Sequence, residues 1–359
     1  MNSLIALTAA LVPLTQGVSV SSVQFLGNLV PSPDDNTVRD LGFVGSIGGK
    51  NILTFGDTNV CSNASTFTNC GVPVAANSAG RIQSPTTFRD TPDQNNPQMF
   101  CKYFSDEDPG NRITNIIATS GTDGVLYFLP ILRNLNAPDS VYAIGAGVAH
   151  ITFTVDGSGT PVWDGSKEPH YGDKSAFISN DLKYIYALGG CNATVAGGSY
   201  VFVSRVPLAN ATSLSAHQYW NGQAWTSTRI NANSAAALKE TSGSLITADN
   251  QGQIAWNKYL NKYIWLQQGV SIRTADNAQG PWTPAQSLFS TGSYAPCSGY
   301  TYSPTYDTLW YSGDQTFVTH VTCINGPIQS FKEPDVFAAF KTTMYVVRSK
   351  VLMRFLQKS

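Results

Sequence analysis

The chain has 359 residues, of which 42% are hydrophobic and 13% are charged, with a formal net charge of −1. That length suffices for one large domain or two smaller ones. The near-neutral charge, without basic clusters, argues against nucleic acids and membranes as partners. A low charged fraction with many Ser, Thr, Asn and Tyr residues suits a secreted all-β protein.

The first segment, MNSLIALTAALVPLTQGVSV, has the pattern of a secretory signal peptide. Its apolar stretch runs from Leu4 to Leu14 and is too short to span a bilayer comfortably, and the small Ser19 suits cleavage. The stretch is preceded by no Lys or Arg, and a buried N-terminal segment is the alternative. We predict a signal peptide over 1–19, a catalytic domain over 20–359 and an extracellular location.

Six cysteines without a CxxC pair favour disulfides over zinc or thioredoxin-like sites. The pairings that we expect are Cys61–Cys70 and Cys297–Cys323, which close short loops, and Cys101–Cys191 by elimination. Three N-x-[ST] sequons in loop-like stretches predict a glycoprotein. They begin at Asn63, Asn192 and Asn210.

Short strand-like runs follow one another along the chain, and helical periodicity is almost absent. They are rich in Val, Ile, Tyr and Phe and are bounded by Gly, Asn, Asp, Ser or Pro. In chain order they include KNILTFGDT, GVLYFLPILR, AHITFTVDG, KYIYALGG, SYVFVSRVPL, GQIAWNKYLNKYIWLQQ, VSIRTA, DTLWYSGD and TMYVVRSKV. Only SAAALKE, near Ala235, suggests a helix, and it is short.

Two stretches of the chain share one plan, which indicates a repeated four-strand unit. Each has a polar turn, an aromatic strand, a strand with an arginine (Arg205 or Arg273) and a closing tryptophan (Trp225 or Trp282). Such repetition is typical of a β-propeller, and about 340 residues at roughly 50–70 per unit make five blades. Strands near both ends, SVQFLGNLV and TMYVVRSKV, can share one blade. We predict a single-domain, disulfide-containing, all-β five-bladed β-propeller.

Two aspartates near the N-terminus are the candidate catalytic pair. Asp57 ends an apolar strand in NILTFGDTNV, which we expect to be the inner strand of the first blade, at the channel mouth. A strand and a glycine turn would bring Asp40, in TVRDLGFVGSIGG, towards it. Glycoside hydrolysis needs two such carboxylates, one to protonate the leaving oxygen and one as nucleophile or base. The alternatives are that Asp57 caps a turn and that Arg39 and Asp40 form a structural ion pair.

The stretch VRDLGFVGSIGGKNILTFGDTNV resembles the N-terminal signature of a propeller family once labelled only as a domain of unknown function and now associated with endo-D-arabinanase activity. IAWNKYLNKYIWLQ and RTADNAQGPWTPAQSLF resemble blade motifs of that family and of five-bladed glycosidases. The resemblance is specific over Val38–Thr58 and Ile254–Leu288, and in plan it covers most of the chain. It implies a glycosidase whose essential aspartates match Asp40 and Asp57. Leu41 departs from the small residue expected after the first aspartate.

Further polar residues are candidates for binding substrate at the same mouth. Lys174 can bind a hydroxyl or carboxylate, and Asp173 can act as a third acid or modulate a pKa, although the two also suit a solvated turn. Asn257 and Asp314 occupy the matching positions in blades four and five. The full set of substrate-binding candidates is Arg39, Thr58, His170, Asp173, Lys174, Asn257 and Asp314.

Aromatic side chains such as Trp220, Trp265 and Tyr294 can stack on sugar faces, although most tryptophans are expected in blade cores. The four histidines lack metal-binding spacing, so we predict no metal ligands and no cofactor, and leave open a structural Ca²⁺ in the channel.

The predicted function is that of a secreted, monomeric glycoside hydrolase that cleaves a furanose-containing, arabinan-like polysaccharide. The alternatives are a carbohydrate-binding lectin or adhesin, and a polysaccharide lyase that uses His170, Tyr171 or Lys174. A lectin usually repeats its site in every blade, whereas the aspartate-bearing signature occurs once, which favours the enzyme.

Overall fold

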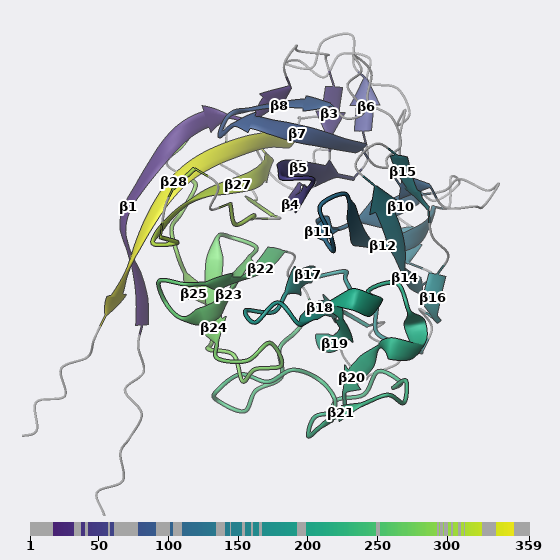
Figure 1. The fold of residues 1–359 in the computed structure, drawn as a ribbon. Coiled ribbons are helices and arrows are strands. Elements are labelled where there is room, and N and C mark those ends of the chain that lie inside the picture. The colour runs from purple at the N-terminus through teal and green to yellow at the C-terminus, as the bar shows by residue number, and fades with distance from the viewer. Residues whose placement is uncertain are drawn as a thin grey trace, which may run out of the picture.

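The computed structural model describes residues 17–31, 37–39, 42–56, 58–60, 78–90, 101–102, 110–133, 141–143, 145–152, 155–158, 161–164, 167–191, 199–248, 252–292, 294, 297, 301–302, 304–307, 310–311, 313–324 and 335–347. Their strands form five sheets placed around a ring, so the predicted five-bladed β-propeller is confirmed (Figure 1).

Each blade is a mainly antiparallel sheet, and its strands succeed one another from the channel outwards. Blade one contains β4 (Phe43–Ile47), β5 (Lys50–Phe55), β7 (Ser78–Ser84), β8 (Thr87–Asp90) and β2 (Val30–Pro31). Blade two contains β10 (Gly110–Ile113), β11 (Ile117–Ala118), β12 (Asp123–Arg133), β13 (Val141–Ala143), β14 (Gly145–Thr152), β16 (Pro161–Asp164), β15 (Val155–Ser158) and β9 (Cys101–Lys102). Blade three contains β17 (Ser175–Ile178), β18 (Tyr184–Gly189), β19 (Phe202–Pro207), β20 (Gln218–Trp220) and β21 (Trp225–Thr226).

The remaining strands complete the ring. Blade four contains β22 (Gly252–Asn257), β23 (Lys262–Gln267), β24 (Ser271–Ala275) and β25 (Gln286–Ser287). Blade five contains β26 (Thr301–Tyr302), β27 (Thr316–Ile324), β28 (Asp335–Val347) and β1 (Gly17–Asn28). A separate two-stranded ribbon joins β3 (Thr37–Arg39) to β6 (Thr58–Val60).

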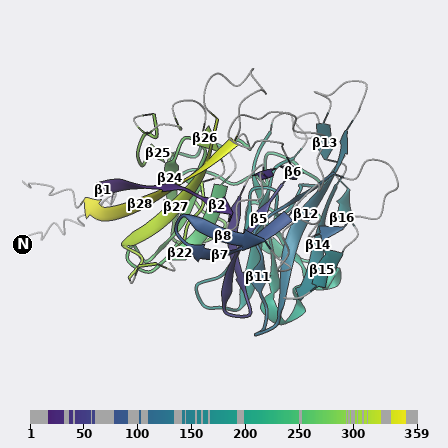
Figure 2. The same ribbon diagram turned by 90° about the horizontal axis from the view of Figure 1, so that it is seen from above.

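The two ends of the described chain close the ring, as the sequence predicts. Strand β1 runs antiparallel to β28, from the pair Gly17–Val347 to the pair Asn28–Ala338, and the two lie side by side in both views (Figures 1 and 2). Val18 is buried in the cluster between blades four and five. The first three residues of β1 therefore belong to the segment assigned above to a signal peptide, whose processing stays a prediction.

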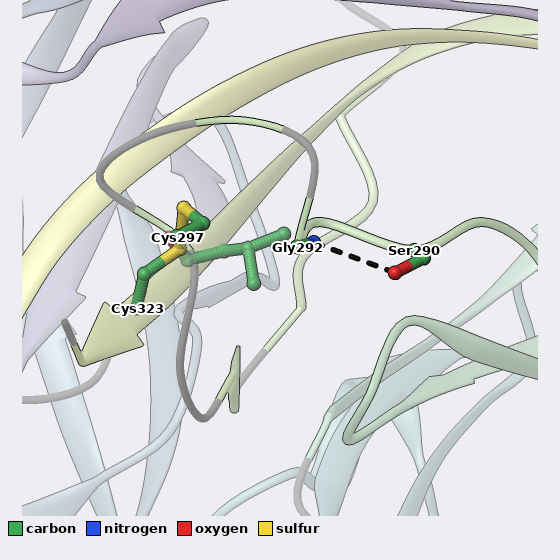
Figure 3. Close-up of a disulfide and its surroundings, with 5 residues drawn as sticks. Ser290, Gly292, Cys297 and Cys323 are labelled. Carbon is green, nitrogen blue, oxygen red and sulfur yellow. Dashed lines mark hydrogen bonds between the residues drawn. A yellow bond between two sulfur atoms is a disulfide. The ribbon is translucent and has the colours of Figure 1, made fainter. Parts of the chain in front are cut away.

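One predicted disulfide is confirmed and one is wrong. Cys297 is bonded to Cys323 of β27, across 26 positions of sequence (Figure 3). Cys191 carries a buried thiol rather than a disulfide. It lies in the core between blades two and three, whereas Cys101 lies on β9 at the outer edge of blade two. Cys61 and Cys70 lie outside the described residues.

The order of strands in blade one also differs from the prediction. The strand of NILTFGDTNV is β5, which is second, and the innermost strand is β4, from the sequence FVGSI. Gly45 interrupts the apolar pattern of β4 because the strand packs directly on blade two, where a Cβ at Gly45 would lie 2.3 Å from the Ile116 carbonyl oxygen. The sequence predicted a strand before the glycine turn, but not that this strand would be the innermost one of the blade.

Apolar side chains fill the space between neighbouring blades. The cluster between blades three and four, for example, contains the fully buried Trp265 and Trp282, and Trp163 is buried between blades two and three. The segment SAAALKE forms turn and extended structure, and the helices of the described residues are two short 3₁₀ turns, Leu208–Asn210 and Leu214–Ala216. No helix in the described part of the chain is long and apolar enough to cross a membrane.

Candidate active site

The inner strands of the five blades surround a cavity of about 320 Å³ on the propeller axis. Its lining includes residues 44–46 of β4, 115–118, 177–178, 253–256 of β22 and 306–307. Gln253 spans this channel, because its Nε2 donates to the Val44 carbonyl at 2.8 Å and its Oε1 accepts from the Tyr306 backbone N–H at 3.3 Å. One buried side chain thus joins blades four, one and five.

The channel has two ends, which the direction of the inner strands distinguishes. Val44 and Gln253 are each the second residue of their inner strand and are bonded to each other, and the Ile254 N–H donates to the Ser175 hydroxyl, the first residue of β17. Strands β4, β17 and β22 therefore begin at the same end, which we call the N-terminal rim and define by Gly42 and residues 168–174. The opposite end, the hairpin rim, carries the turns at 48–49, 179–183 and 258–261.

The N-terminal rim of blade one carries the two chain segments that flank the predicted catalytic aspartates. Arg39 of β3 pairs with Thr58 of β6, the last residues of the ribbon on this side. Asp40 follows Arg39 and Asp57 precedes Thr58, and both aspartates lie outside the described residues. Phe43 pairs with Thr54, so the start of β4 and the end of β5 also meet here.

Thr58 fixes the backbone on both sides of Asp57 rather than facing solvent. Its side chain is completely buried, its Oγ1 donates to the Gly56 carbonyl at 3.1 Å, and the same oxygen lies 2.8 Å from the Ser78 Oγ of β7. This hydrogen bond links residue 58 to residue 56. These contacts of Thr58 are structural, and its predicted contact with substrate stays a prediction.

Arg39 is also buried, with 3% exposure. Its guanidinium carbon lies 5.3 Å from the ring centroid of Phe55 and 4.9 Å from that of Phe88. A guanidinium over aromatic faces is held by cation–π attraction and by packing. Arg39 thus anchors the ribbon of β3 and β6 on the core of blade one, and its burial does not suit the predicted contact with substrate.

Asp173 and Lys174 lie together at the N-terminal rim of blade three, directly before β17. Lys174 Nζ is 2.8 Å from Asp173 Oδ2, and each side chain is only 9% exposed. A Cβ at Gly190 would lie 3.3 Å from Lys174 Cε, so the absence of a side chain there makes room for the pair. These residues form a buried ion pair rather than the solvated turn that the sequence also allowed.

The loop that presents this ion pair is held by backbone hydrogen bonds. The N–H groups of Gly172 and Lys174 donate to the Leu188 carbonyl, and the half-buried His170 accepts at its carbonyl from the Asp173 N–H at 3.0 Å. Gly172 has φ of +96°, and a Cβ there would lie 2.2 Å from Tyr127. These bonds place His170, Asp173 and Lys174 directly before β17 at the N-terminal rim, and their predicted contact with substrate stays a prediction.

A second ion pair at this rim was not foreseen. Arg229 bonds Glu168 with two nitrogens, Nε to Oε1 at 2.7 Å and Nη2 to Oε2, and Glu168 is 8% exposed. The two residues are 61 positions apart, and Arg229 lies in a polar stretch with no pattern of its own. Of the two residues, only Glu168 could have been singled out from the sequence as a candidate for this rim, because it lies in the same segment as His170.

Asn257 and Asp314 lie at the hairpin rim, so the expectation that they share the mouth with Asp173 is wrong. The fully buried Asn257 donates from Nδ2 to the Tyr306 hydroxyl and to the Asp314 carbonyl, both at 2.8 Å. The Asp314 carboxylate accepts from the Lys258 N–H. The error arises because Asn257 ends its inner strand, whereas Asp173 precedes its own, and the two ends of one strand face opposite rims. Both residues join the hairpins of blades four and five.

The described residues contain no group of three or more His, Cys, Asp or Glu side chains that could hold a metal ion. The two buried histidines are engaged elsewhere. His217 Nδ1 donates to the Ser213 carbonyl at 2.9 Å, and His320 Nε2 donates to the Pro85 carbonyl at 2.9 Å. Burial lowers the pKa of each, so both stay neutral at physiological pH.

Known structures share this fold although their sequences differ. A protein from Bacteroides ovatus described as a hydrolase aligns with a TM-score of 0.57 and 13% identity, over 94% of this chain and 97% of its own. An exo-β-1,3-galactanase from Phanerochaete chrysosporium, solved with β-1,3-galactotriose, aligns with a TM-score of 0.50 and 11% identity, over 92% of this chain and 64% of its own. No family profile and no curated protein sequence matches this chain. At such identities the likeness establishes the five-bladed propeller fold.

Proposed function

We propose that this protein is a glycoside hydrolase that uses Asp40 and Asp57 to cleave a furanose-containing, arabinan-like polysaccharide. The observation that carries the proposal is the pairing of Arg39 with Thr58 at the N-terminal rim. Since successive Cα atoms are about 3.8 Å apart, each aspartate is attached within one residue of that pair. This pairing supports the proposal that the two acids act at the same end of the channel, since propellers bind ligands there.

The chemistry is a displacement at the anomeric carbon. One carboxylic acid gives its proton to the leaving glycosidic oxygen while the bond from that oxygen to the anomeric carbon breaks. The other carboxylate either attacks that carbon or removes a proton from the water that does so. In this proposal Asp173 acts as a third acid beside the two aspartates, and Lys174 stabilises its negative charge.

The substrate class follows from the resemblance of the N-terminal signature, and the galactanase that shares this fold makes β-1,3-galactan the second polysaccharide to test. The signal-like segment over 1–19, the disulfide between Cys297 and Cys323 and the exposed sequon at Asn210 support secretion. We further propose that the protein acts as a monomer and without a catalytic metal.

The test replaces Asp40 and Asp57 individually by Asn and measures reducing sugar released from arabinan, β-1,3-galactan and arabinoxylan. We expect each substitution to slow release by about 10²–10⁴-fold. Asp276→Asn is the matched control, because Asp276 is 76% exposed and pairs only with Lys262 within the described part of the chain. Unchanged release in both site variants would refute the two-aspartate mechanism, and an unsaturated, ultraviolet-absorbing product from polygalacturonate, a uronate polymer on which a lyase can act, would identify a lyase instead.

A further inference from the structure

A cluster of aromatic side chains lies on the side of blade three that faces blade four, away from the N-terminal rim. Its base consists of three buried rings, Phe177, Tyr186 and Tyr263, with exposures of 4%, 8% and 4%. Four half-buried rings pack on that base and reach solvent; they are Tyr184, Trp220, Trp225 and Trp256. We call these four residues the aromatic shelf.

The rings of the shelf form one continuous chain of contacts. Trp220 and Trp225 lie 5.5 Å apart between centroids, and Trp225 lies 5.8 Å from Tyr186. Tyr186 also contacts Tyr184, at 6.3 Å, and Trp256 lies 4.9 Å from Tyr263 in an edge-on arrangement. The buried rings therefore hold the half-exposed ones in fixed orientations.

Two residues of the shelf lie at the outer edge of blade three. The outermost strand of that blade is β21, with Trp225 (Figure 1). In register, Trp225 pairs with Trp220 of β20, which places both indoles on the same face of this edge. Tyr184 and Trp256 continue the shelf towards the hairpin rim.

Polar groups lie between the rings. The Arg205 guanidinium carbon lies 4.4 Å from the Tyr184 centroid and 4.3 Å from that of Trp225, and its Nε donates to Gln218 Oε1 at 2.8 Å. The charge of Arg205 is thus covered by two ring faces. Asn180, bonded to the Tyr263 hydroxyl, adds an amide at the hairpin end.

We propose that the aromatic shelf is a second carbohydrate-binding surface, which holds a neutral polysaccharide chain outside the active site. Flat rings with amide and guanidinium groups between them match a sugar, whose faces carry C–H bonds and whose edge carries hydroxyls. The charge of Arg205 is covered by ring faces, and the neighbouring Asp181 and Lys183 pair with each other at 3.3 Å, so a neutral ligand fits better than a polyanion or a basic peptide. Tryptophan and tyrosine present large rigid surfaces with polar edges, and half-exposed groups of them mark binding sites.

This surface is distinct from the proposed catalytic site, and only the identity of the polysaccharide rests on the proposed function. The test measures retardation of the full chain in native gels that contain arabinan, β-1,3-galactan or arabinoxylan. We expect Trp225→Ala and Trp220→Ala each to weaken retardation by about tenfold in dissociation constant, the equivalent of losing one ring contact. Trp225→Phe keeps a ring on the base and should retain most of the binding even if Trp225→Ala folds poorly.

The matched control is Tyr345→Ala, since Tyr345 is a 43% exposed aromatic residue of β28 outside the shelf. Release of sugar from a short oligosaccharide should stay within about twofold in all shelf variants, because such a ligand does not span both sites. If retardation is lost in Asp40→Asn but unchanged in the tryptophan variants, the proposal that the aromatic shelf binds polysaccharide is wrong. Absence of retardation on all three polysaccharides would also overturn it. Shelf-dependent retardation without any hydrolysis would support the shelf and refute the proposed function.

Discussion

Lys174 and Asp173, adjacent in sequence, form an ion pair of 2.8 Å at the N-terminal rim while each side chain is 9% exposed. Two charges at that depth stabilise the fold only together, since either one alone would be buried without compensation. The pair therefore links the stability of the rim to the electrostatics of the candidate site.

Removing one member of this pair should be costly. We expect Lys174→Met or Asp173→Asn to lower the free energy of unfolding by about 3–5 kcal/mol, and the double variant to lose less than the sum. Urea denaturation of the four proteins gives the double-mutant cycle. Lys183→Met is the control, because Lys183 and its partner Asp181 are 73% and 46% exposed. Strictly additive losses would contradict a coupled pair.

Thr58 should affect activity through Asp57. Thr58→Val removes the hydroxyl that bonds Gly56 and Ser78, so we expect a loss of about 1–3 kcal/mol in unfolding free energy and a lower kcat with little change in KM. Thr58→Ser keeps the hydroxyl, so its unfolding free energy and its kcat should stay close to those of the parent protein. Thr316→Val is the matched control, since its hydroxyl pairs with Thr343 in blade five, at 3.0 Å. An equal loss of kcat in the control would mean that the effect is general destabilisation.

The two buried histidines predict a loss of stability in acid. Burial lowers the folded-state pKa of His217 and His320 below the unfolded value of about 6.5, although Asp307 opposes the shift at His320. The unfolded chain therefore binds more protons below that pH, so stability is complete above about pH 6.5 and falls as the pH decreases through it.

Urea denaturation between about pH 7.5 and pH 5 measures this effect. We expect His320→Gln to reduce the slope of unfolding free energy against pH, because glutamine can still donate to the Pro85 carbonyl but cannot be protonated. His217→Gln should reduce the slope as well, because burial lowers the pKa of His217 in the same direction. A slope that is equal in all three proteins would contradict the assignment.

The disulfide should stabilise the closing blade. Cys297 and Cys323 enclose a loop across 26 positions, and the chain-entropy model assigns such a link about 2–4 kcal/mol. We expect Cys297→Ala and the double alanine variant to lose similar amounts of unfolding free energy in guanidinium. A double variant as stable as the parent would show that pairing of β1 with β28 closes the ring without the link.

Local patterns were enough to identify the fold class. Alternating Val, Ile, Tyr and Phe between turn residues is a property of each strand alone, and the four-strand plan around Arg205 and Arg273 recurs along the chain. The pairing of terminal strands in one blade was equally predictable, because a ring needs closure and the unit count left one strand at each end.

The candidate site was only partly predictable. The sequence PHYGDKSAF indicated that His170, Asp173 and Lys174 precede an inner strand, and the structure places them at the N-terminal rim. Their burial, the contact of Gly190 with Lys174 and the ion pair between Glu168 and Arg229 depend on segments that are distant in sequence. Contacts between such distant segments cannot be predicted from the spacing of residues in the sequence.

Strand periodicity, turn chemistry and the even cysteine count are local or compositional, so by themselves they specified an all-β ring with a disulfide. Which rim a residue occupies is different, because it depends on the direction of each strand and on its rank within the blade. Asn257 and Asp314 lie at the hairpin rim for that reason, and the inner position of blade one belongs to the glycine-containing β4 rather than to β5. The aromatic cluster that includes Trp220 and Trp225 arises only when blades three and four pack together.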